Sequence, residues 1–226
     1  MSTVSPALKN LFDIIPFDDI IVNEANIIGG LIMSHFFAIL SRMKYIKRWG
    51  LMRNNREENL SEHTLEVAYI AQALAVISNK RFGGDFDPNA VAAAAMFHDT
   101  SEILTGDLPT PIKYYNPDIK SAYKKIEAIA EDELISMLPS DMQDFYREFY
   151  TPDEKTEHLI KAADKLSALI KCIEEKNMGN REFSSAEQSA REALASLNLP
   201  EANVFMEEFL PSFSMTLDEQ RQIKKQ

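Results

Sequence analysis

Two histidines and two aspartates, far apart along the chain, constrain the fold more than any other feature of the sequence. His63 precedes the adjacent pair His98-Asp99 by 35 residues, and Asp164 follows that pair by 65 residues. Each lies in a segment whose apolar residues recur at helical spacing. Side chains so distant in sequence can meet if a bundle brings three helices together. The sequence therefore predicts an all-α fold in which these four side chains converge.

The rest of the chain beyond residue 30 also has the pattern of helices. Glycine is scarce, and no run alternates convincingly at the two-residue period typical of strands. N-cap residues, prolines and apolar spacing predict helices over 31–47, 61–78, 88–104, 117–138, 141–149, 154–176, 184–197 and 201–209. The second helix is expected to begin after the N-cap Ser61 and to turn inward Leu65, Ala68, Ala71, Leu74 and Ile77. Gly106 is expected to end the third, before a loop that contains prolines.

The first 30 residues differ in composition from the remainder. They are acidic and apolar, are broken by Pro6 and Pro16, and close on Gly29-Gly30. The length fits one domain, with or without an extension. We therefore expect an N-terminal extension over 1–30 and one helical domain over 31–226. The extension is either a short helix packed on the body or a partly ordered tail.

Charge and composition limit the partners of the chain. The net charge of −11 argues against binding a nucleic acid polymer, which needs basic patches, but leaves room for a small phosphorylated substrate beside a local metal and arginine. No stretch approaches the roughly 20 apolar residues of a membrane helix, and the N-terminus lacks a secretory signal pattern. The single cysteine, Cys172, suits a reducing compartment. We expect a cytoplasmic protein that does not bind membranes.

The four convergent side chains have the chemistry of a metal site. Mixed nitrogen and oxygen ligands suit a divalent ion such as Mn, Co, Fe or Zn, and four protein ligands leave positions for water and substrate. Each histidine could instead be a hydrogen-bonded interior residue, and Asp164 a carboxylate on a helix surface. Asp164, however, sits among small or apolar residues, so its charge needs a partner; they are Ala162, Ala163, Leu166 and Ala168.

Two acidic residues follow the His98-Asp99 pair. Glu102 lies three and four residues later, which on a helix places it on the same face. A carboxylate there can orient an attacking water or take its proton, although a solvated residue at the helix end has the same spacing. Asp107 lies in a loop that Pro109 and Pro111 stiffen, so its carboxylate is expected to be held rigidly. The alternative is that Asp107 only helps to form the turn.

Arg48 and Trp49 are candidates for binding a substrate. A guanidinium can hold a phosphate in a charge-assisted fork, beside a rigid indole wall. The alternative is a surface arginine next to a core tryptophan. Spacing does not choose between Arg48 and the other basic candidates, which are Arg42, Arg53, Arg56 and Lys113. Of the remaining histidines, His35 is left as a supporting or capping group, and His158 receives no role.

Several motifs accompany these residues. They are Ser34-His35-Phe36-Phe37-Ala38, Arg48-Trp49, Leu51-Met52-Arg53-Asn54, Ser61-Glu62-His63, Phe97-His98-Asp99, Ser101-Glu102, Leu104-Thr105-Gly106-Asp107-Leu108-Pro109-Thr110-Pro111, Ala163-Asp164 and Pro211-Ser212-Phe213. Together they resemble the bacterial 5′-deoxynucleotidases of the HD-domain phosphohydrolase superfamily, over about residues 34–217. The run through the proline loop is the specific part, whereas a His-Asp pair alone is not. The chain departs from the family in its first 30 residues and at Ile39, where a more polar residue is expected.

The resemblance implies a fold, an activity and a set of roles. The fold is an HD-domain helical bundle, usually a homodimer. The activity is hydrolysis of deoxyribonucleoside 5′-monophosphates with one divalent metal, such as cobalt or manganese. The resemblance places metal ligands on His63, His98, Asp99 and Asp164, phosphate binding on Arg48, sugar selection on Trp49, and catalytic acidic roles on Glu102 and Asp107. Asp107 is also a candidate for binding the sugar.

Two other functions stay open on the sequence alone. The same hydrolase chemistry would serve a cyclic nucleotide or a nucleoside triphosphate. A module that binds a nucleotide or a protein partner without catalysis would need no metal, and damaged ligands would favour it. All four candidate ligands are intact here, which favours an enzyme.

Overall fold

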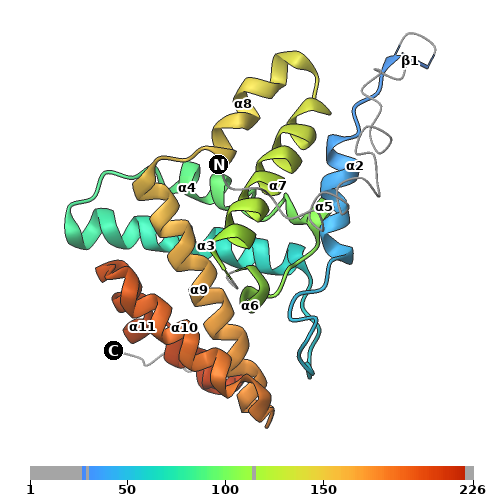
Figure 1. Ribbon diagram of the computed structural model, residues 1–226. Coiled ribbons are helices and arrows are strands. Elements are labelled where there is room, and N and C mark those ends of the chain that lie inside the picture. The colour runs from blue at the N-terminus through green and yellow to red at the C-terminus, as the bar shows by residue number, and fades with distance from the viewer. Residues whose placement is uncertain (1–26, 29–30, 114–115, 222–226) are drawn as a thin grey trace.

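The all-α prediction is confirmed by a computed structural model that describes residues 27–28, 31–113 and 116–221 (Figure 1). Within these ranges the strands are limited to a two-residue antiparallel ribbon, β1 (Ile27–Ile28) with β2 (Leu31–Ile32). Most of the expected extension, residues 1–26 and 29–30, lies outside the described residues. In the described part, no helix is long and apolar enough to span a membrane.

The helices of the body follow one another along the chain, with a long loop over residues 46–59. Their bounds are α2 (Phe36–Leu40), the 3-10 helix η2 (Ser41–Tyr45), α3 (Leu60–Ile77), the π-helical turn η3 (Ser78–Phe82), α4 (Pro88–Ala95), α5 (Glu102–Thr105), α6 (Thr110–Lys113), α7 (Pro117–Ser136), α8 (Ser140–Tyr150), α9 (Glu154–Asn177), the 3-10 helix η4 (Arg181–Phe183), α10 (Ser184–Leu197), α11 (Pro200–Glu208), the 3-10 helix η5 (Leu210–Ser214) and α12 (Leu217–Arg221). The five predicted helices from residue 117 to residue 209 are confirmed, with ends that agree within two residues.

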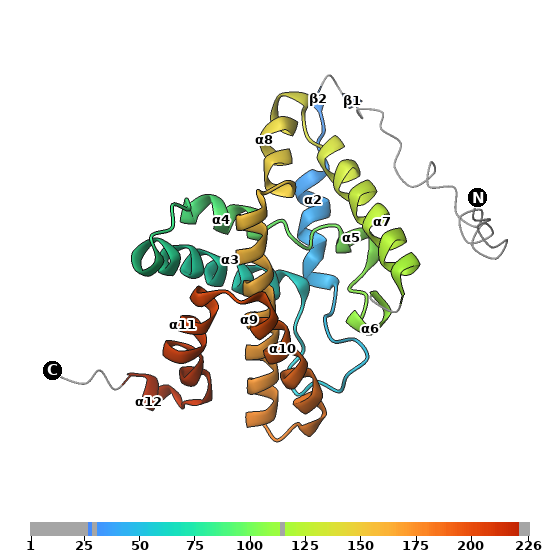
Figure 2. The ribbon, with the colours of Figure 1, turned by 60° about the vertical axis from the view of Figure 1, so that its left-hand side comes forward.

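The long helix α9 lies at the centre of the body. It packs against α3 and α10, while α4 packs on α3. Figures 1 and 2 show α7 and α8 on one side of α9 and the C-terminal helices at its other end. The main core joins α3, α9 and α10 through buried side chains. They include Val67, Ile70, Leu74, Leu159, Leu166, Leu169, Ile170 and Leu194. A second cluster, Phe36 with Leu134 and Leu138, ties α2 to α7, and Ile39 packs against it, which accounts for an apolar residue there.

The predicted helix over 31–47 is wrong in its start and in its regularity. Residues 31–32 belong to the ribbon, and Ser34 Oγ donates a hydrogen bond to the Met137 carbonyl oxygen, 103 residues away. Helix α2 begins only at Phe36 and tightens into a 3-10 helix after Leu40. His35 occupies the N-cap position without a side-chain cap bond, so its capping role is not supported.

The predicted continuous helix over 88–104 is also wrong, because the chain leaves regular α-helix after Ala95. The Phe97 amide bonds to the Ala94 carbonyl, and the Thr100 amide to the Phe97 carbonyl, so these bonds reach back three residues instead of four. Side chains capture carbonyls as well, since Thr100 Oγ1 donates to the Phe97 oxygen at 2.9 Å. Such tight turns often mark a functional segment. Glu102 therefore does not share a regular helix face with the His98-Asp99 pair.

The helix that carries His63 begins earlier than expected. Its N-cap is Asn59, whose side chain accepts from the Glu62 amide, while the Glu62 carboxylate accepts from the Asn59 amide. This reciprocal pair satisfies two backbone donors that the helix itself leaves free. The inward face contains the expected Ala68, Ala71, Leu74 and Ile77, but Leu65 is 63% exposed. Each residue of an α-helix advances about 100° around the helix axis. Leu65 follows His63 by two residues, so its side chain points about 200° away, onto the opposite face.

This N-cap yields a prediction for stability. Asn59→Ala should lower the free energy of unfolding by about 1 kcal/mol, because it removes the cap bond to the Glu62 amide. Ser61→Ala, at the position expected from the sequence, should have an effect within about 0.5 kcal/mol. Urea unfolding followed by circular dichroism measures both variants. Equal losses in the two would contradict the assignment of the cap.

Candidate metal centre and surrounding site

The four predicted ligands converge where α3, α9 and the tight turns after α4 meet. His63 Nε2 lies 3.5 Å from Asp99 Oδ2 and 3.3 Å from Asp164 Oδ1. His98 Nε2 lies 3.1 Å from the same Asp99 oxygen. Ligand atoms of His63, His98 and Asp99 all lie within 4.8 Å of one another. Side chains separated by up to about a hundred residues thus present nitrogen and oxygen atoms to one point.

The arrangement fits a divalent metal ion. Two ligands at about 2.1 Å from an ion, at octahedral or tetrahedral angles, lie about 3.0–3.4 Å apart, which matches the spacings seen here. The Nε2 atoms of His63 and His98 are both buried and have no hydrogen-bond partner. Buried polar atoms without a partner are costly and need an explanation, and a metal ion provides it for both nitrogens. The site is therefore a divalent-metal site of two imidazoles with at least one carboxylate.

Hydrogen bonds on the other ring nitrogens orient both histidines. His98 Nδ1 lies 2.7 Å from the Ala95 carbonyl oxygen, which can only accept, so Nδ1 carries the hydrogen. His63 Nδ1 lies 3.0 Å from Ser167 Oγ, whose own hydrogen goes to Glu66 Oε2 at 2.6 Å. The hydroxyl oxygen thus accepts from His63. Each Nε2 is thus the ring nitrogen that faces the cluster, as a metal ligand requires.

The charges of the cluster hold one another in ionised form. Burial opposes a charge on His98, but Asp99 and Asp164 outweigh it and raise the pKa of His98 to about 9. Burial likewise disfavours the Asp99 carboxylate, yet the adjacent His98 and His63 keep the pKa of Asp99 well below its usual value. The pKa of Asp164 is lowered as well, by its contact with His63 and by Lys165. A metal ion that binds here must displace the proton of His98.

Arg48 is the basic candidate that reaches the cluster. Its Nη1 lies 3.6 Å from Asp99 Oδ2. Burial would lower the pKa of Arg48, but the surrounding aspartates and glutamate raise it, and Asp107 is among them. Arg53 pairs instead with Glu182 and is almost fully exposed. Arg48, one of the basic candidates that the sequence left open, thus lies within ion-pair distance of a predicted metal ligand.

Trp49 follows Arg48 and is half-buried. Its indole Nε1 donates to Glu58 Oε2 at 2.9 Å, and its ring lies 5.3 Å from that of Phe183. Its backbone φ is 60°, a left-handed conformation that is uncommon outside glycine. Such conformations persist only where surrounding contacts enforce them, and they cluster at functional sites.

Glu102 is buried beside the cluster and is held by Lys113. Lys113 Nζ donates to Glu102 Oε1 at 2.6 Å, while Glu102 Oε2 is buried without a partner. Burial and then the Asp99 charge raise the pKa of Glu102 to about 7, despite the opposing effect of Lys113. Lys113, a phosphate candidate on sequence grounds, is therefore paired with a carboxylate. The charge of Asp107 also contributes to raising the pKa of Glu102.

Three residues of this environment were missed by the sequence analysis. They are Glu58, Glu66 and Ser167. Glu66 follows His63 by three residues, and Ser167 follows Asp164 by three residues, so helical spacing from each ligand could have indicated them. Glu58 lies in an irregular loop, where no spacing rule applies. His158 is exposed on α9, in agreement with its having no role.

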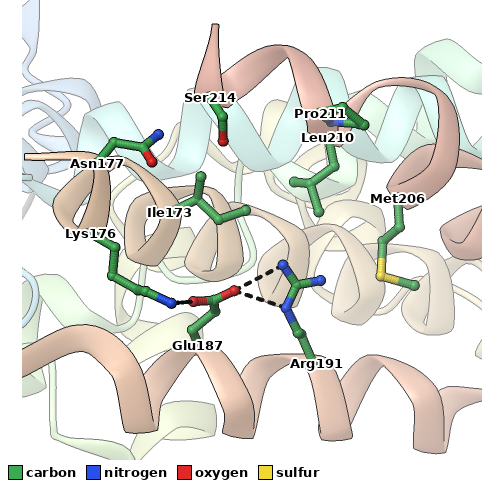
Figure 3. A pocket seen from close by; sticks show the side chains of 9 residues that line it. All are labelled: Ile173, Lys176, Asn177, Glu187, Arg191, Met206, Leu210, Pro211 and Ser214. Carbon is green, nitrogen blue, oxygen red and sulfur yellow. Dashed lines mark hydrogen bonds and ion pairs between the residues drawn. The ribbon is translucent and has the colours of Figure 1, made fainter. Parts of the chain in front are cut away.

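A surface cavity of about 360 Å³ lies away from this cluster, between α9, α10 and the C-terminal segment (Figure 3). Glu187 pairs in it with both Lys176 and Arg191, the latter at 2.9 Å. Ile173, which lines the cavity, follows Asp164 by nine residues, or about 14 Å of helix. Because its charged groups already pair with one another, we assign this cavity no part in the chemistry.

The metal centre yields a prediction for binding. His98→Ala and Asp164→Ala should each lower the affinity for Mn²⁺ or Co²⁺ by more than the roughly 10- to 100-fold that loss of an outer partner costs. Helical content should change little, because the core lies elsewhere along α3 and α9. His158→Ala, on the exposed face of α9, is the matched control. Titration calorimetry on metal-free protein measures the affinity, and wild-type affinity in both ligand variants would contradict the assignment.

Comparison with known proteins agrees with the geometry. The family model described as YfbR-like 5′-deoxynucleotidase matches residues 35–213. A 5′-deoxynucleotidase of Vibrio vulnificus strain YJ016 is 51% identical over 82% of this chain and 97% of its own length. One of Yersinia pestis strain Pestoides F is 52% identical over 83% of this chain and 96% of its own.

A solved structure gives the fold independently. An HD-domain phosphohydrolase from Listeria innocua superposes with a TM-score of 0.70 at 24% identity, over 79% of this chain and 88% of that one. The helical architecture is thus that of an HD-domain protein. The chain belongs to the YfbR-like 5′-deoxynucleotidase family of HD-domain phosphohydrolases, a family of hydrolytic enzymes.

Proposed function

We propose that the protein hydrolyses deoxyribonucleoside 5′-monophosphates to deoxynucleoside and inorganic phosphate. The observation that carries this proposal is Arg48, whose guanidinium lies 3.6 Å from a carboxylate of the metal cluster. A phosphate monoester held at the cluster would also meet this arginine, and both partners offset its charge. Relatives named 5′-deoxynucleotidases, about half identical over most of the chain, support the same substrate.

In this proposal His63, His98, Asp99 and Asp164 hold one divalent ion. These ligands offer nitrogen and oxygen atoms, and no thiol lies among them. When bound, the ion supplies Lewis-acid chemistry, polarising a phosphoryl oxygen and lowering the pKa of water. Cobalt and manganese are the proposed ions, in accord with the mixed nitrogen and oxygen ligands.

The remaining residues act on the phosphate, the water and the sugar. Arg48 binds phosphate oxygens through its guanidinium fork. Glu102, whose Oε2 is buried without a partner, accepts the proton of the water that attacks phosphorus. That proton is then available to the 5′-oxygen as its bond to phosphorus breaks. Asp107 binds the 3′-hydroxyl, and Trp49 forms the wall at the 2′ position.

Assembly and location are part of the same proposal. The resemblance favours a homodimer, and the single cysteine favours the cytoplasm. The acidic net charge is unsuited to a nucleic acid polymer as a partner. Residues 1–30 are proposed as an extension, since the family match begins at residue 35.

One experiment tests the activity directly. Purified protein, stripped of metal by a chelator, is supplied in turn with Mn²⁺, Co²⁺, Zn²⁺ and Mg²⁺. Phosphate release is then measured from deoxyribonucleoside and ribonucleoside monophosphates, with a cyclic nucleotide and a nucleoside triphosphate for the alternative substrates. We expect metal-dependent release with a preference for the deoxy monophosphates. Release that survives chelation, or that occurs only with the alternative substrates, would overturn the proposal.

Glu102→Ala should retain the metal and lose about 10²- to 10⁴-fold in kcat, the usual contribution of general acid–base catalysis. In the wild type, kcat/KM should fall as the pH drops through the pKa of Glu102, because only the ionised carboxylate accepts a proton. That pKa is about 7 without a metal, and a bound cation lowers it. Glu207→Ala, on the exposed face of α11, is the control. A kcat within a few-fold of wild type would remove Glu102 from the mechanism.

Trp49→Ala should narrow the preference for deoxyribose. A rigid wall at the 2′ position leaves a ribose hydroxyl desolvated and unpaired, which costs about 5- to 150-fold in kcat/KM. The ratio of kcat/KM for dAMP over AMP should therefore shrink in the variant, with phosphate binding mainly kept. Tyr45→Ala removes an exposed aromatic ring nearby in sequence and serves as the control. An unchanged ratio would mean that Trp49 only packs.

A further inference from the structure

We propose that Glu58 is a positioning residue that fixes the relative placement of Arg48 and Trp49, and thereby the sugar preference of the site. The inference rests on the proposed function, because it takes Arg48 and Trp49 as substrate contacts. Glu58 itself is not proposed to touch the substrate. It acts through the two side chains that do.

A single carboxylate lies among three functional side chains. Glu58 Oε2 accepts the indole hydrogen of Trp49 at 2.9 Å. Glu58 Oε1 lies 3.4 Å from Arg48 Nε and 3.6 Å from His63 Nδ1. The Glu58 side chain is only 13% exposed, so solvent screens these contacts little. One residue thus contacts the phosphate-binding candidate, the sugar wall and a metal-ligating histidine.

The conformation of Trp49 makes this contact important. Its left-handed backbone is disfavoured for a residue with a side chain, so contacts from outside must enforce it. The Trp49 carbonyl accepts from the Met52 amide at 2.9 Å, which fixes the backbone turn. Phe183 packs against the ring. Neither of these contacts involves the indole nitrogen. The hydrogen bond to Glu58 does involve it. Glu58 therefore determines how the ring is turned.

The same residue also locates Arg48. The Arg48 amide donates to the Glu58 carbonyl at 3.0 Å, joining the two backbones across the loop. The Arg48 guanidinium then lies between the carboxylates of Glu58 and Asp99, with contacts of 3.4 and 3.6 Å. Arg48 Nε makes no hydrogen bond, so the charge of Glu58 is what holds that edge. A shift of Glu58 would move the phosphate contact and the sugar wall relative to each other.

The test compares Glu58→Gln and Glu58→Ala with Glu57→Gln. Glutamine keeps the shape of Glu58 but offers one acceptor oxygen, whereas Arg48 and Trp49 both present donors. Glu57 is the adjacent residue, is 72% exposed and pairs with the exposed Lys47, so it is a matched control. Circular dichroism and urea unfolding establish that each variant is folded; if Glu58→Ala does not fold, Glu58→Gln carries the test.

The chain contains a single tryptophan, so tryptophan fluorescence, excited selectively, reports on Trp49 alone. In both Glu58 variants we expect a shifted emission maximum and stronger quenching by acrylamide. We also expect kcat/KM for dAMP to fall by about 100-fold, as misplacement of a substrate contact by about 1 Å does. The ratio of kcat/KM for dAMP over AMP should shrink by at least about 5-fold. Glu57→Gln should match the wild type in all four measurements.

Two results would overturn the proposal. If fluorescence and the dAMP-to-AMP ratio in the Glu58 variants equal those of Glu57→Gln, Glu58 does not position Trp49. If fluorescence changes while the ratio stays constant, Glu58 orients the indole without setting sugar preference. Failure of the proposed function is distinguishable from both, because the wild type would then release no phosphate from dAMP, while the fluorescence comparison would still report on the Glu58–Trp49 bond.

Discussion

The contact of His63 with two carboxylates is the interaction on which the site depends. His63 is fully buried on α3, Asp164 comes from α9, and Asp99 comes from the turns after α4. Bringing charged groups together inside a protein has a large desolvation cost, which their mutual attraction often only offsets. Apolar residues of similar volume would stabilise the same junction at least as well. The cluster is therefore best understood as a functional feature that the surrounding core supports.

Sequence patterns predicted the fold well where local signals decide it. The helix expected over 154–176 matches α9 because Asp153 caps its first turn and its apolar face is regular. The predictions of continuous helices over 31–47 and 88–104 were wrong for a different reason. In both segments, side-chain bonds reach partners far away in the chain, such as the Met137 oxygen that accepts from Ser34 and the Tyr150 hydroxyl that accepts from Thr100. Helical periodicity carries no information on such partners.

The residues of the candidate site also fall into those that the sequence indicates and those that only the fold identifies. His63, His98, Asp99 and Asp164 could be found because buried ionisable residues in apolar helices are rare and need a common explanation. Arg48 could be chosen among the basic candidates only once its distance to Asp99 was known. Glu58 could not be found at all, because an acidic residue in a loop is ordinary. Its importance comes entirely from the three side chains that the fold places around it.

Helix α9 connects the metal centre to the loop that carries the proposed substrate contacts. Eleven residues after Asp164, or about 16 Å along the helix, Glu175 accepts from the backbone amides of Asn55 and Arg56 at 2.9 and 3.1 Å. Lys171, one turn earlier, pairs with Glu175 and donates to the Arg56 carbonyl. These bonds tie the loop between η2 and α3 to the helix, although Asn55 and Arg56 themselves are exposed. The rigid helix thus serves as a common frame, so that a metal ligand and the loop leading back from Trp49 keep a fixed separation. Discrimination by a wall at the 2′ position needs such a frame, because a wall that moves by an ångström no longer distinguishes a hydroxyl from a hydrogen.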